Sequence, residues 1–399
     1  MKVGIYGGTF NPPHLGHTNA AAAACTVLGL DKLLFVPASL PPHKQLSEDA
    51  ASAACRLEML SIAVDGLRFG ELAEVSALEL ERSGKSYTVD TVSSIHEKYP
   101  EAELYLLMGS DMFLTVQNWY RAGEILAECK IVGFARSEDD SAQKLKAHAE
   151  YLQRTFGAGS SVIALPNIVD VSSTRLRAML AAGEDTSAYL AAPVYGYILR
   201  KGLYGTNADL KHLPDSDLRA VSHSMVKAKR IPHIRGTEET AVLLAHRWGV
   251  DPDKARRAAI LHDCTKYLTL DEQLKLCEEY GIVLDNLERE TLKLLHSKTG
   301  AAIAKHVFGE PDDVVGAIYY HTTGRPEMTA LEKVLYLADY MEPTRHFDGV
   351  EKLRRLAELD LDRAVAEGLA MTIEEMNGRT LPVHPATQEA LNWLKGNVL

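Results

Sequence analysis

The feature that most limits how this 399-residue chain can fold is a glycine-rich turn between an apolar run and an alanine-rich segment. The apolar run, residues 3–6, ends at the pair Gly7-Gly8, and residues 18–25 have high helix propensity. This order predicts a strand, a turn and a helix. Glycine lets a backbone pass close to a phosphate, and a helix N-terminus offers unpaired N–H groups and the positive end of its dipole. The turn is therefore a candidate nucleotide-phosphate site.

Two histidines follow the turn at positions where both can contact one anion. His14 and His17 lie three residues apart, so a helix that starts here carries both imidazoles on one face. Their His-x-Gly-His spacing is neither the dinucleotide pattern Gly-x-Gly-x-x-Gly nor the P-loop, which ends in Gly-Lys-Ser/Thr. Taken alone, the residues also fit an ordinary turn followed by surface histidines. The residues of this segment by themselves leave both interpretations open.

Two further apolar runs, residues 33–37 and 104–108, predict buried strands of a parallel sheet. The residues of interest after these runs are His43, Lys44, Gly109 and Asp111. Open α/β sheets bind ligands at the carboxyl ends of their strands, so we expect these residues to lie near a ligand. Lysine suits phosphate as a point charge, and a carboxylate suits ribose hydroxyls.

A cluster of hydroxyl residues predicts another helix start later in the chain. Ser172, Ser173 and Thr174 precede an apolar helical pattern, so their hydroxyls and amides can cap a helix and also hold a triphosphate. Capping alone explains the hydroxyl residues. It does not explain Arg175, whose guanidinium can bind phosphate oxygens with two N–H groups at once.

Five segments within the first 205 residues resemble bacterial nicotinate-nucleotide adenylyltransferases of the nucleotidyltransferase superfamily. They are residues 7–17, with the motif Gly-Gly-Thr-Phe-Asn-Pro-Pro-His-x-Gly-His, and residues 41–44, 86–91, 108–119 and 171–175. The resemblance implies a Rossmann-like α/β domain with a parallel sheet, the substrates ATP and nicotinate mononucleotide, and Mg²⁺ bound with ATP. The alternative is an adenylyl- or cytidylyltransferase for another substrate such as phosphopantetheine, against which residues 11–13 and 86–91 argue.

The same resemblance implies roles for individual residues. His14, His17, Lys44 and Arg175 would stabilise the reacting phosphates, and Trp119 would stack on the nicotinate ring unless it is an ordinary core residue. The substrate contacts it implies are Gly8, Thr9, Phe10, His43, Thr88, Gly109, Asp111, Trp119, Arg136, Ser172, Ser173 and Thr174.

The sequence pattern changes near residue 206. Polar residues 205–209 and 214–217 mark a join. Before it strands alternate with helices, and after it leucine- and alanine-rich helical patterns dominate. Length also favours at least two domains. We predict an α/β domain at 1–205, a linker at 206–217 and an all-α domain at 218–399.

The predicted helical domain contains six residues of types that bind metal ions: His233, His262, Asp263, His296, His321 and Asp339. The His262-Asp263 pair ends the apolar run 258–261, which directs both side chains inward, where an unpaired charge is costly. A metal ion removes that cost. Histidine with carboxylate suits zinc, iron or manganese, and a carboxylate can bridge two ions.

The segments around these six residues resemble bacterial HD-domain hydrolases that split diadenosine tetraphosphate symmetrically. The motifs are residues 230–233, 261–266, 295–297, 320–326 and 338–343. The resemblance implies two transition-metal ions, iron or else manganese or zinc, with Asp263 as the catalytic bridging ligand. Lys266, Thr322 and Arg325 are expected to bind the other phosphates, although surface charge alone also explains Lys266 and Arg325. A second alternative is that the domain is a non-catalytic nucleotide sensor or interaction module.

Composition limits the partners. The net charge of −11 predicts no nucleic-acid partner. Five cysteines without a Cys-x-x-Cys pair indicate reduced thiols in a cytoplasm. Met1 leads straight into the first strand, so we expect no signal peptide, and residues 18–30 are too short and alanine-rich to span a membrane. The oligomeric state is open, with a homo-oligomer as one alternative.

Overall fold

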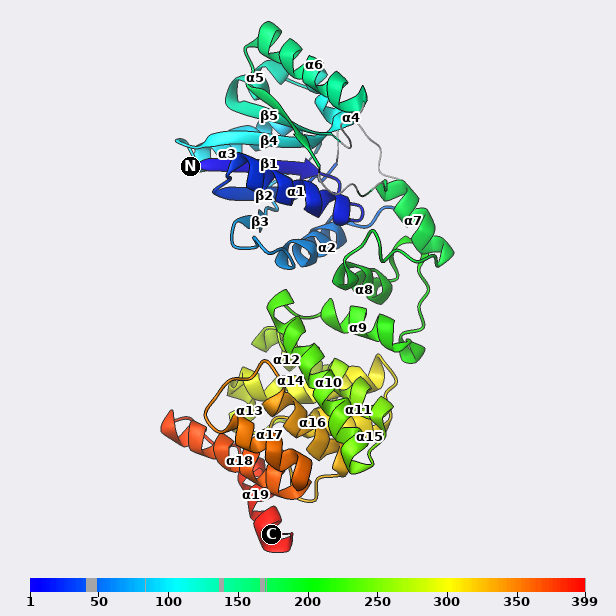
Figure 1. The fold of residues 1–399 in the computed structure, drawn as a ribbon, viewed down its shortest axis with the longest axis vertical. Helices are drawn as coiled ribbons and strands as arrows, with labels where there is room; N and C mark the ends of the chain where they lie inside the picture. Colours follow the sequence, from blue (N-terminus) through cyan, green and yellow to red (C-terminus); the bar gives the residue numbers. More distant parts are fainter. Residues whose placement is uncertain (41–48, 83, 136–139, 166–168, 170, 399) are drawn as a thin grey trace. The chain divides into compact units, whose positions relative to one another are not determined.

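The computed structural model describes residues 1–40, 49–82, 84–135, 140–165, 169 and 171–398. Contacts divide the chain into two compact units, Met1–Asn207 and Ala208–Leu399. Figure 1 shows a sheet flanked by helices in the first unit and helices in the second. Among the described residues, no helix has both the length and the apolar character needed to cross a bilayer.

A parallel sheet forms the centre of the first unit. Its strands are β1 (Lys2–Gly8), β2 (Lys32–Pro37), β3 (Ala73–Val75), β4 (Glu103–Gly109), β5 (Cys129–Ala135) and β6 (Ser160–Ala164). They lie in the order β3-β2-β1-β4-β5-β6, with every neighbouring pair parallel. The chain builds outward from β1 on one side and then from β4 on the other. Ligands of such sheets bind outside the carboxyl ends of the strands where the order reverses, here β1 and β4.

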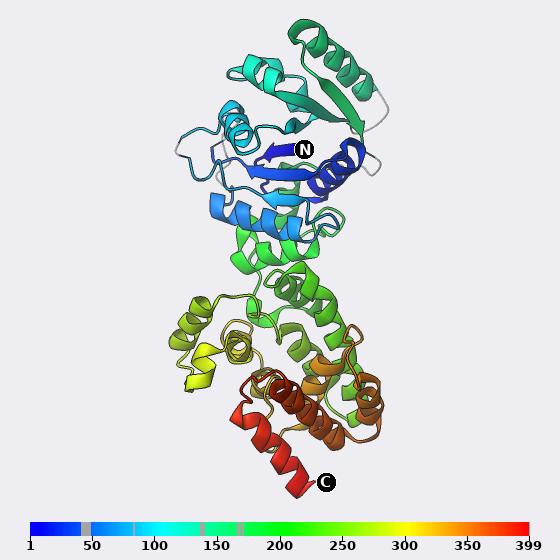
Figure 2. The ribbon, with the colours of Figure 1, turned by 90° about the vertical axis from the view of Figure 1, so that its left-hand side faces the viewer.

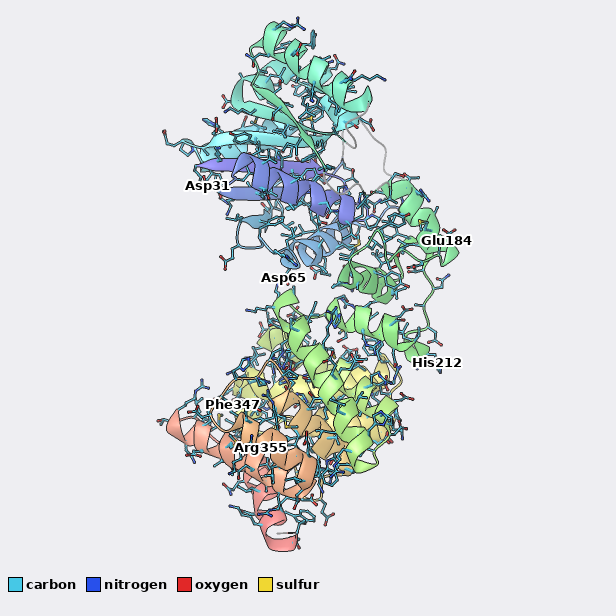
Figure 3. The ribbon with its side chains drawn as sticks, in the orientation of Figure 1. Asp31, Asp65, Glu184, His212, Phe347 and Arg355 are labelled. Atoms are coloured by element: carbon cyan, nitrogen blue, oxygen red, sulfur yellow. The ribbon has the colours of Figure 1, made fainter. Side chains whose placement is uncertain are left out.

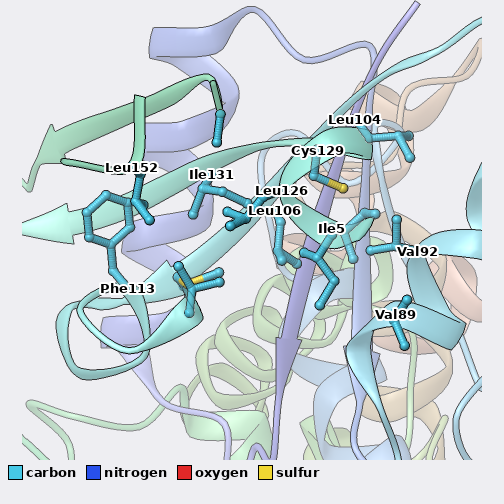
Figure 4. Packing of buried hydrophobic residues seen from close by; sticks show 14 of the residues in the cluster. Ile5, Val89, Val92, Leu104, Leu106, Phe113, Leu126, Cys129, Ile131 and Leu152 are labelled. Atoms are coloured by element: carbon cyan, nitrogen blue, oxygen red, sulfur yellow. The ribbon is translucent and has the colours of Figure 1, made fainter. Parts of the chain in front are cut away.

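Helices cover both faces of this sheet. They are α1 (Leu15–Leu28), α2 (Ala53–Asp65), α3 (Thr88–Lys98), α4 (Ser110–Phe113), η1 (Val116–Asn118), α5 (Ala122–Glu128) and α6 (Asp140–Phe156). Successive residues of β2 alternate between two cores: Leu33 and Phe35 pack with α1 and α2, whereas Leu34 and Val36 pack with α3 and α5. Figure 4 shows the second core. The predicted α/β fold with a parallel sheet is confirmed.

A smaller helical layer completes the first unit. It consists of α7 (Ser173–Ala182), α8 (Ala192–Lys201) and η2 (Leu203–Gly205). Leu176, Val194 and Tyr204 of this layer share a buried cluster with Met59 of α2. The last residues of the unit are therefore packed against a helix that lies early in the chain.

The second unit is helical throughout its described residues, as predicted. Its elements are η3 (Leu210–His212), α9 (Asp215–His223), η4 (Ala228–Arg230), α10 (Ile231–Trp248), α11 (Pro252–Leu261), α12 (Leu270–Glu279), α13 (Asn286–Glu290), α14 (Leu292–His306), α15 (Asp312–Tyr320), α16 (Ala330–Met341), α17 (Val350–Leu359), α18 (Leu361–Gly378) and α19 (Pro385–Asn397). α10, α11, α15 and α16 pack on one another, and α14 packs on α15. Figure 2 shows these helices from the side.

Candidate active sites

The glycine turn at the end of β1 is fixed from within the core. Phe10 follows Gly8 and Thr9 with a left-handed backbone (φ 48°), and its ring is buried against Tyr6. A Cβ on Gly8 would lie 3.0 Å from the Phe10 ring, whereas a Cβ on Gly7 would meet nothing within 4 Å. Phe10 thus supports the turn from below, and the backbone at Gly7 is open to a ligand.

His14 and His17 are brought together at the start of α1. The His14 backbone N–H donates to Nδ1 of His17 at 3.1 Å, and the two ring centroids lie 3.8 Å apart. Because Nδ1 of His17 accepts a hydrogen bond, its proton resides on Nε2. A Cβ on Gly16 would come within 3.0 Å of the His14 ring. The middle glycine of His-x-Gly-His is therefore required by the packing of the first histidine.

The electrostatics of His17 favour a neutral ring. Burial lowers the pKa of His17 well below its usual range, and the neighbouring His14 imidazole lowers it further. The ring also lies 5.0 Å from the Phe10 ring, centroid to centroid. At neutral pH His17 therefore offers an N–H donor at Nε2 and carries no charge.

A second helix N-terminus lies beside the first. Ser172 caps α7 by accepting from the Arg175 backbone N–H at 3.1 Å, and Ser173 Oγ donates to the Pro12 carbonyl at 3.5 Å. The N-terminal ends of α1 and α7 thus meet through Ser173 and Pro12, and the positive ends of two helix dipoles favour an anion near them. Thr174 and Arg175 are exposed at this end of α7.

Two buried arginines fix the turn, and sequence reasoning missed both. Arg177 donates to Asp49 Oδ2 at 2.8 Å and to the Asn11 carbonyl at 3.0 Å, while the Tyr204 hydroxyl donates to Asn11 Oδ1 at 2.7 Å. These contacts join segments that are more than 120 residues apart in sequence, so no local pattern could have indicated them.

Arg56 is the second of these arginines. It is 1% exposed and donates to the Thr9 carbonyl at 2.9 Å and the Ala38 carbonyl at 2.7 Å. It therefore ties the loop after β1 to the loop after β2. The carbonyl and N–H of a trans peptide point in opposite directions, so the Phe10 amide faces away from Arg56. Burial lowers the pKa of Arg56.

The end of β4 carries the other predicted contacts. Gly109 ends β4 and caps α4, and Asp111 is exposed in the first turn of that helix. Trp119 follows η1 and is partly buried against the sheet core. Thr88 begins α3 just after Tyr87, whose ring centroid lies 4.6 Å from that of Tyr120. Predicted residues His43, Lys44 and Arg136 lie outside the described part of the chain.

All six predicted metal-type residues of the second unit come together. His233 lies in the first turn of α10, His296 in α14 and Asp339 in α16, while His262 and His321 directly follow α11 and α15, and Asp263 comes next after His262. Every one except Asp339 is buried, and 16% of the Asp339 side chain is exposed.

These residues form two groups of three. His233, His262 and Asp339 form one, and Asp263, His296 and His321 form the other, with the ligand atoms of each group within 4.8 Å of one another. Asp263 lies between the groups: its Oδ2 is 3.5 Å from His262 Nε2, and its Oδ1 is 3.2 Å from His296 Nε2. A carboxylate in this position can bridge two ions.

The four histidines point the same ring nitrogen inward. Each Nδ1 meets an outer acceptor: the carbonyls of Ala259 (2.6 Å), Lys293 (2.8 Å) and Ile318 (2.7 Å), and Glu342 Oε1 (3.0 Å). Because these partners only accept, each Nδ1 carries the proton and each Nε2 presents a lone pair. Nε2 of His296 and His321 lie 3.1 Å apart, and those of His233 and His262 3.3 Å apart. Facing lone pairs at these distances fit a shared cation.

Charge states at neutral pH match the same chemistry. Burial, then the neighbouring His296 and His262, lowers the pKa of His321 to about 3, so this ring stays neutral. Burial opposes ionisation of Asp263 and Asp339, but the surrounding imidazoles outweigh it and hold the pKa of both carboxyls well below the usual range. His262 differs, because Asp263 outweighs the effect of burial and raises the pKa of its ring. Neutral imidazoles and ionised carboxylates are the forms that bind metal, so metal binding would release the proton of His262.

Glu342 orients His233 and was missed from sequence, although the segment 338–343 contains it. It is fully buried, accepts the proton of His233 Nδ1 and accepts the Thr344 amide at 2.6 Å. Gly236 faces this carboxylate, and a Cβ there would collide with it. Such outer partners fix the tautomer and raise the basicity of a ligating histidine.

Three cationic side chains border the ligands. Arg230 lies 2.5 Å from Asp263 Oδ2, Arg345 lies 3.0 Å from Asp339 Oδ1, and Lys266 Nζ lies 3.0 Å from His296 Nε2. Lys266 was predicted here, whereas Arg230 and Arg345 were not assigned a role. Both arginines reach their carboxylates through tertiary structure, which sequence does not reveal.

Thr322 and Arg325 have protein partners. The Thr322 hydroxyl donates to Ser297 Oγ at 3.1 Å, and Arg325 pairs with both carboxylate oxygens of Glu332 while its guanidinium lies 5.0 Å from the Tyr320 ring centroid. Glu332 also belongs to the capping box that starts α16. The structure thus gives Arg325 a structural contact, and its phosphate-binding role stays a prediction.

A third group of metal-type residues lacks this arrangement. Asp285, Glu288 and His384 lie together, but His384 Nδ1 accepts the Ala386 amide at 3.2 Å, so its Nε2 carries the proton. Lys298 pairs with Glu288 at 2.5 Å. This group is an ion-pair cluster, unlike the two groups around Asp263.

Comparisons with known families and proteins match both units. A model described as Cytidylyltransferase-like matches residues 5–179, and the HD domain model matches residues 230–344. The "Probable nicotinate-nucleotide adenylyltransferase" of Gloeobacter violaceus is 40% identical over 209 residues, which are 52% of this chain and 98% of that protein.

Further similarity lies in the helical part. The "Bis(5'-nucleosyl)-tetraphosphatase, symmetrical" of Bacillus subtilis is 40% identical over 166 residues, which are 41% of this chain and 89% of that protein. A solved structure of an "HD superfamily hydrolase involved in NAD metabolism" from Clostridium acetobutylicum aligns with 46% of this chain and 98% of its own, at 37% identity and a TM-score of 0.45.

Proposed function

The chain belongs to the nicotinate-nucleotide adenylyltransferase family in its first half and to the symmetrical bis(5'-nucleosyl)-tetraphosphatase family in its second, and we propose that one polypeptide catalyses both reactions. The first unit transfers AMP from ATP to nicotinate mononucleotide, giving nicotinate adenine dinucleotide and pyrophosphate. The second cleaves diadenosine tetraphosphate into two molecules of ADP. The observation that carries the proposal is that each compact unit holds its own set of converging polar groups.

In the transfer reaction, a phosphate oxygen of nicotinate mononucleotide attacks the α-phosphorus of ATP. The bond from that phosphorus to the bridging oxygen breaks, and pyrophosphate leaves with the electron pair. No residue needs to form a covalent bond, so the protein acts by aligning two anions and stabilising charge. We assign the Nε2 donor of His17 and the N-termini of α1 and α7 to the phosphates, because these groups lie close together at the end of β1. Arg175, Lys44 and Mg²⁺ bound with ATP would balance the negative charge.

Specificity for the acid form is part of this proposal. Trp119 and the start of α3 at Thr88 border the same edge of the sheet as the turn, and we assign them to the nicotinate ring and its carboxylate. A site built to pair a carboxylate leaves donors unmatched when the amide binds. Nicotinate mononucleotide should therefore be preferred over the nicotinamide form.

In the hydrolase unit, two divalent cations, iron or else manganese or zinc, fit the two ligand groups joined by Asp263. When bound, they would lower the pKa of water and neutralise phosphate charge during in-line displacement. The chain's own contribution is to hold four imidazoles by their Nδ1 protons and to keep both carboxylates ionised. Lys266 lies beside His296, and Thr322 follows His321 in the chain, so we assign both to phosphate oxygens of the substrate.

The test uses the full chain and two variants that separate the reactions. Asp263→Asn should lose bound metal and tetraphosphate cleavage while pyrophosphate release in the transfer reaction stays normal. His17→Asn should do the reverse. Chromatography of the products, with and without chelator, and metal analysis are the readouts. Metal-loaded wild-type protein that binds diadenosine tetraphosphate without cleaving it would instead support a nucleotide sensor.

A further inference from the structure

We propose that Arg230 and Arg345 bind substrate phosphates and, together with Lys266, select substrates by the length of their phosphate chain. The inference rests on the proposed hydrolase function and deepens it. The three residues come from separate places in the chain: Arg230 ends η4, Lys266 follows α11, and Arg345 follows α16. Arg345 lies two residues before Phe347, which Figure 3 labels in the segment between α16 and α17.

The three cations lie on the accessible side of the ligand groups. The side chains of Arg230, Lys266 and Arg345 are 18%, 30% and 35% exposed, whereas that of Asp263 is fully buried. A ligand that approaches Asp263 past these partly exposed side chains would come close to all three of them. A phosphate chain that enters in this way would meet two guanidinium groups and one ammonium group.

Each arginine has N–H groups left for a phosphate. A guanidinium has five N–H donors. Arg230 approaches Asp263 with Nε and one terminal nitrogen, and Arg345 uses Nε for the Asp339 carbonyl and one terminal nitrogen for its carboxylate. Arg325 differs because its Nε and one terminal nitrogen pair with Glu332, and its other terminal nitrogen donates to the Pro326 carbonyl. We therefore exclude Arg325 from this phosphate-binding set.

Charge explains why chain length should matter. Three carboxylates, those of Asp263, Asp339 and Glu342, face three cationic side chains, so with neutral imidazoles their charges sum to about zero. Two divalent cations would raise the total to about +4. A tetraphosphate bridge carries about four negative charges and a diphosphate bridge about two, at one per phosphate. Only the longer bridge comes close to balancing the site. Nicotinate adenine dinucleotide, the product of the other unit, has the shorter bridge.

The competing explanation is that both arginines only position the carboxylates. If so, removing an arginine should disturb metal binding first. If the arginines bind phosphate, metal content should hold while affinity for phosphate chains falls. The two roles are therefore separated by measuring bound metal and phosphate affinity on the same protein.

The experiment uses metal-loaded full-length protein with Arg230→Met, Arg345→Met and Arg345→Lys. Arg379→Met is the control, because Arg379 pairs with Glu375 on the surface of α18. Tripolyphosphate and pyrophosphate are the probes in calorimetric titration, and diadenosine tetra-, tri- and diphosphate are the kinetic substrates. Metal per chain is measured in parallel.

We expect each methionine variant to weaken tripolyphosphate binding and raise KM for the tetraphosphate by about tenfold to a hundredfold, the usual effect of losing a charged hydrogen bond. Metal content should stay unchanged, and the ratio of kcat/KM for the tetraphosphate to that for the diphosphate should fall. Arg345→Lys should recover part of the lost affinity for tripolyphosphate. Because Arg345 is more exposed than Arg230, Arg345→Met keeps the test valid if Arg230→Met fails to fold.

Unchanged tripolyphosphate affinity in folded variants would overturn the inference, as would loss of metal at unchanged affinity for phosphate. Failure of the hydrolase proposal looks different. In that case wild-type protein would cleave no dinucleotide, and arginine-dependent tripolyphosphate binding would still support the inference.

Discussion

Replacing His17 with asparagine isolates one hydrogen bond in the transfer site. The asparagine carbonyl can take over the position of Nδ1 and accept the His14 amide, but no donor remains at the position of Nε2. Since His17 is neutral, the loss is that of one preorganised donor and no charge. Such a loss costs about 2.7–4 kcal/mol, or a hundredfold to a thousandfold in kcat. We expect the lower end, because a neutral donor makes a weaker bond than a charged one.

The assay is pyrophosphate release under saturating ATP and nicotinate mononucleotide, with unfolding free energy measured on the same samples. His96→Asn is the matched control, since His96 is a surface histidine of the same unit. Because the pKa of His17 lies well below 6.5, the ratio of wild-type to variant rates should stay constant between pH 6 and 8. A folded His17→Asn protein with a rate within threefold of wild type would refute the reasoning.

Three other predictions concern packing, metal affinity and pH. Gly16→Ala should push the His14 ring aside and lower kcat by about tenfold with a small loss of stability, and unchanged kcat in pyrophosphate release would contradict the packing argument. Glu342→Gln should weaken metal affinity by about tenfold to a hundredfold in chelator competition, because Glu342 orients the candidate ligand His233. Unchanged metal affinity would show that this contact is dispensable. Burial, then Arg235 and Arg219, lowers the pKa of His223 to about 4, so the free energy of unfolding of the second unit should fall by about 3 kcal/mol between pH 6.5 and pH 4. Urea unfolding of His223→Phe should show a weaker dependence of this free energy on pH. An equal dependence in wild type and variant would reject the prediction.

Local sequence patterns were sufficient to predict the main secondary-structure elements and to name the candidate metal ligands. The predicted strand, glycine turn and helix near the start of the chain are confirmed, because each depends on residues that are neighbours in sequence. The helix α1 extends beyond the alanine-rich segment and runs from Leu15 to Leu28. His262 and Asp263 could be named because they end an apolar helical run, where they are costly without a partner. The other four candidate ligands came from their residue types and from the resemblance to HD-domain hydrolases. Their grouping around Asp263 required the fold.

Residues that act through distant contacts could not be predicted. Arg56 reads as an ordinary polar position on a helix, yet it is buried and holds two loop carbonyls. Glu342 and Arg345 received no role from the sequence, yet they contact a candidate ligating histidine and a candidate ligating carboxylate. Each depends on packing between helices, which neither periodicity nor spacing records.

The contacts that close the N-terminal turn set the order in which the first unit can mature on the ribosome. Asn11 is made before its partners Arg177 and Tyr204, which follow 166 and 193 residues later. At synthesis rates of about 5–20 residues per second, the turn waits roughly 10–40 s for Tyr204. In a nascent chain the contacts of the N-terminal turn therefore stay incomplete until nearly the whole first unit has been translated.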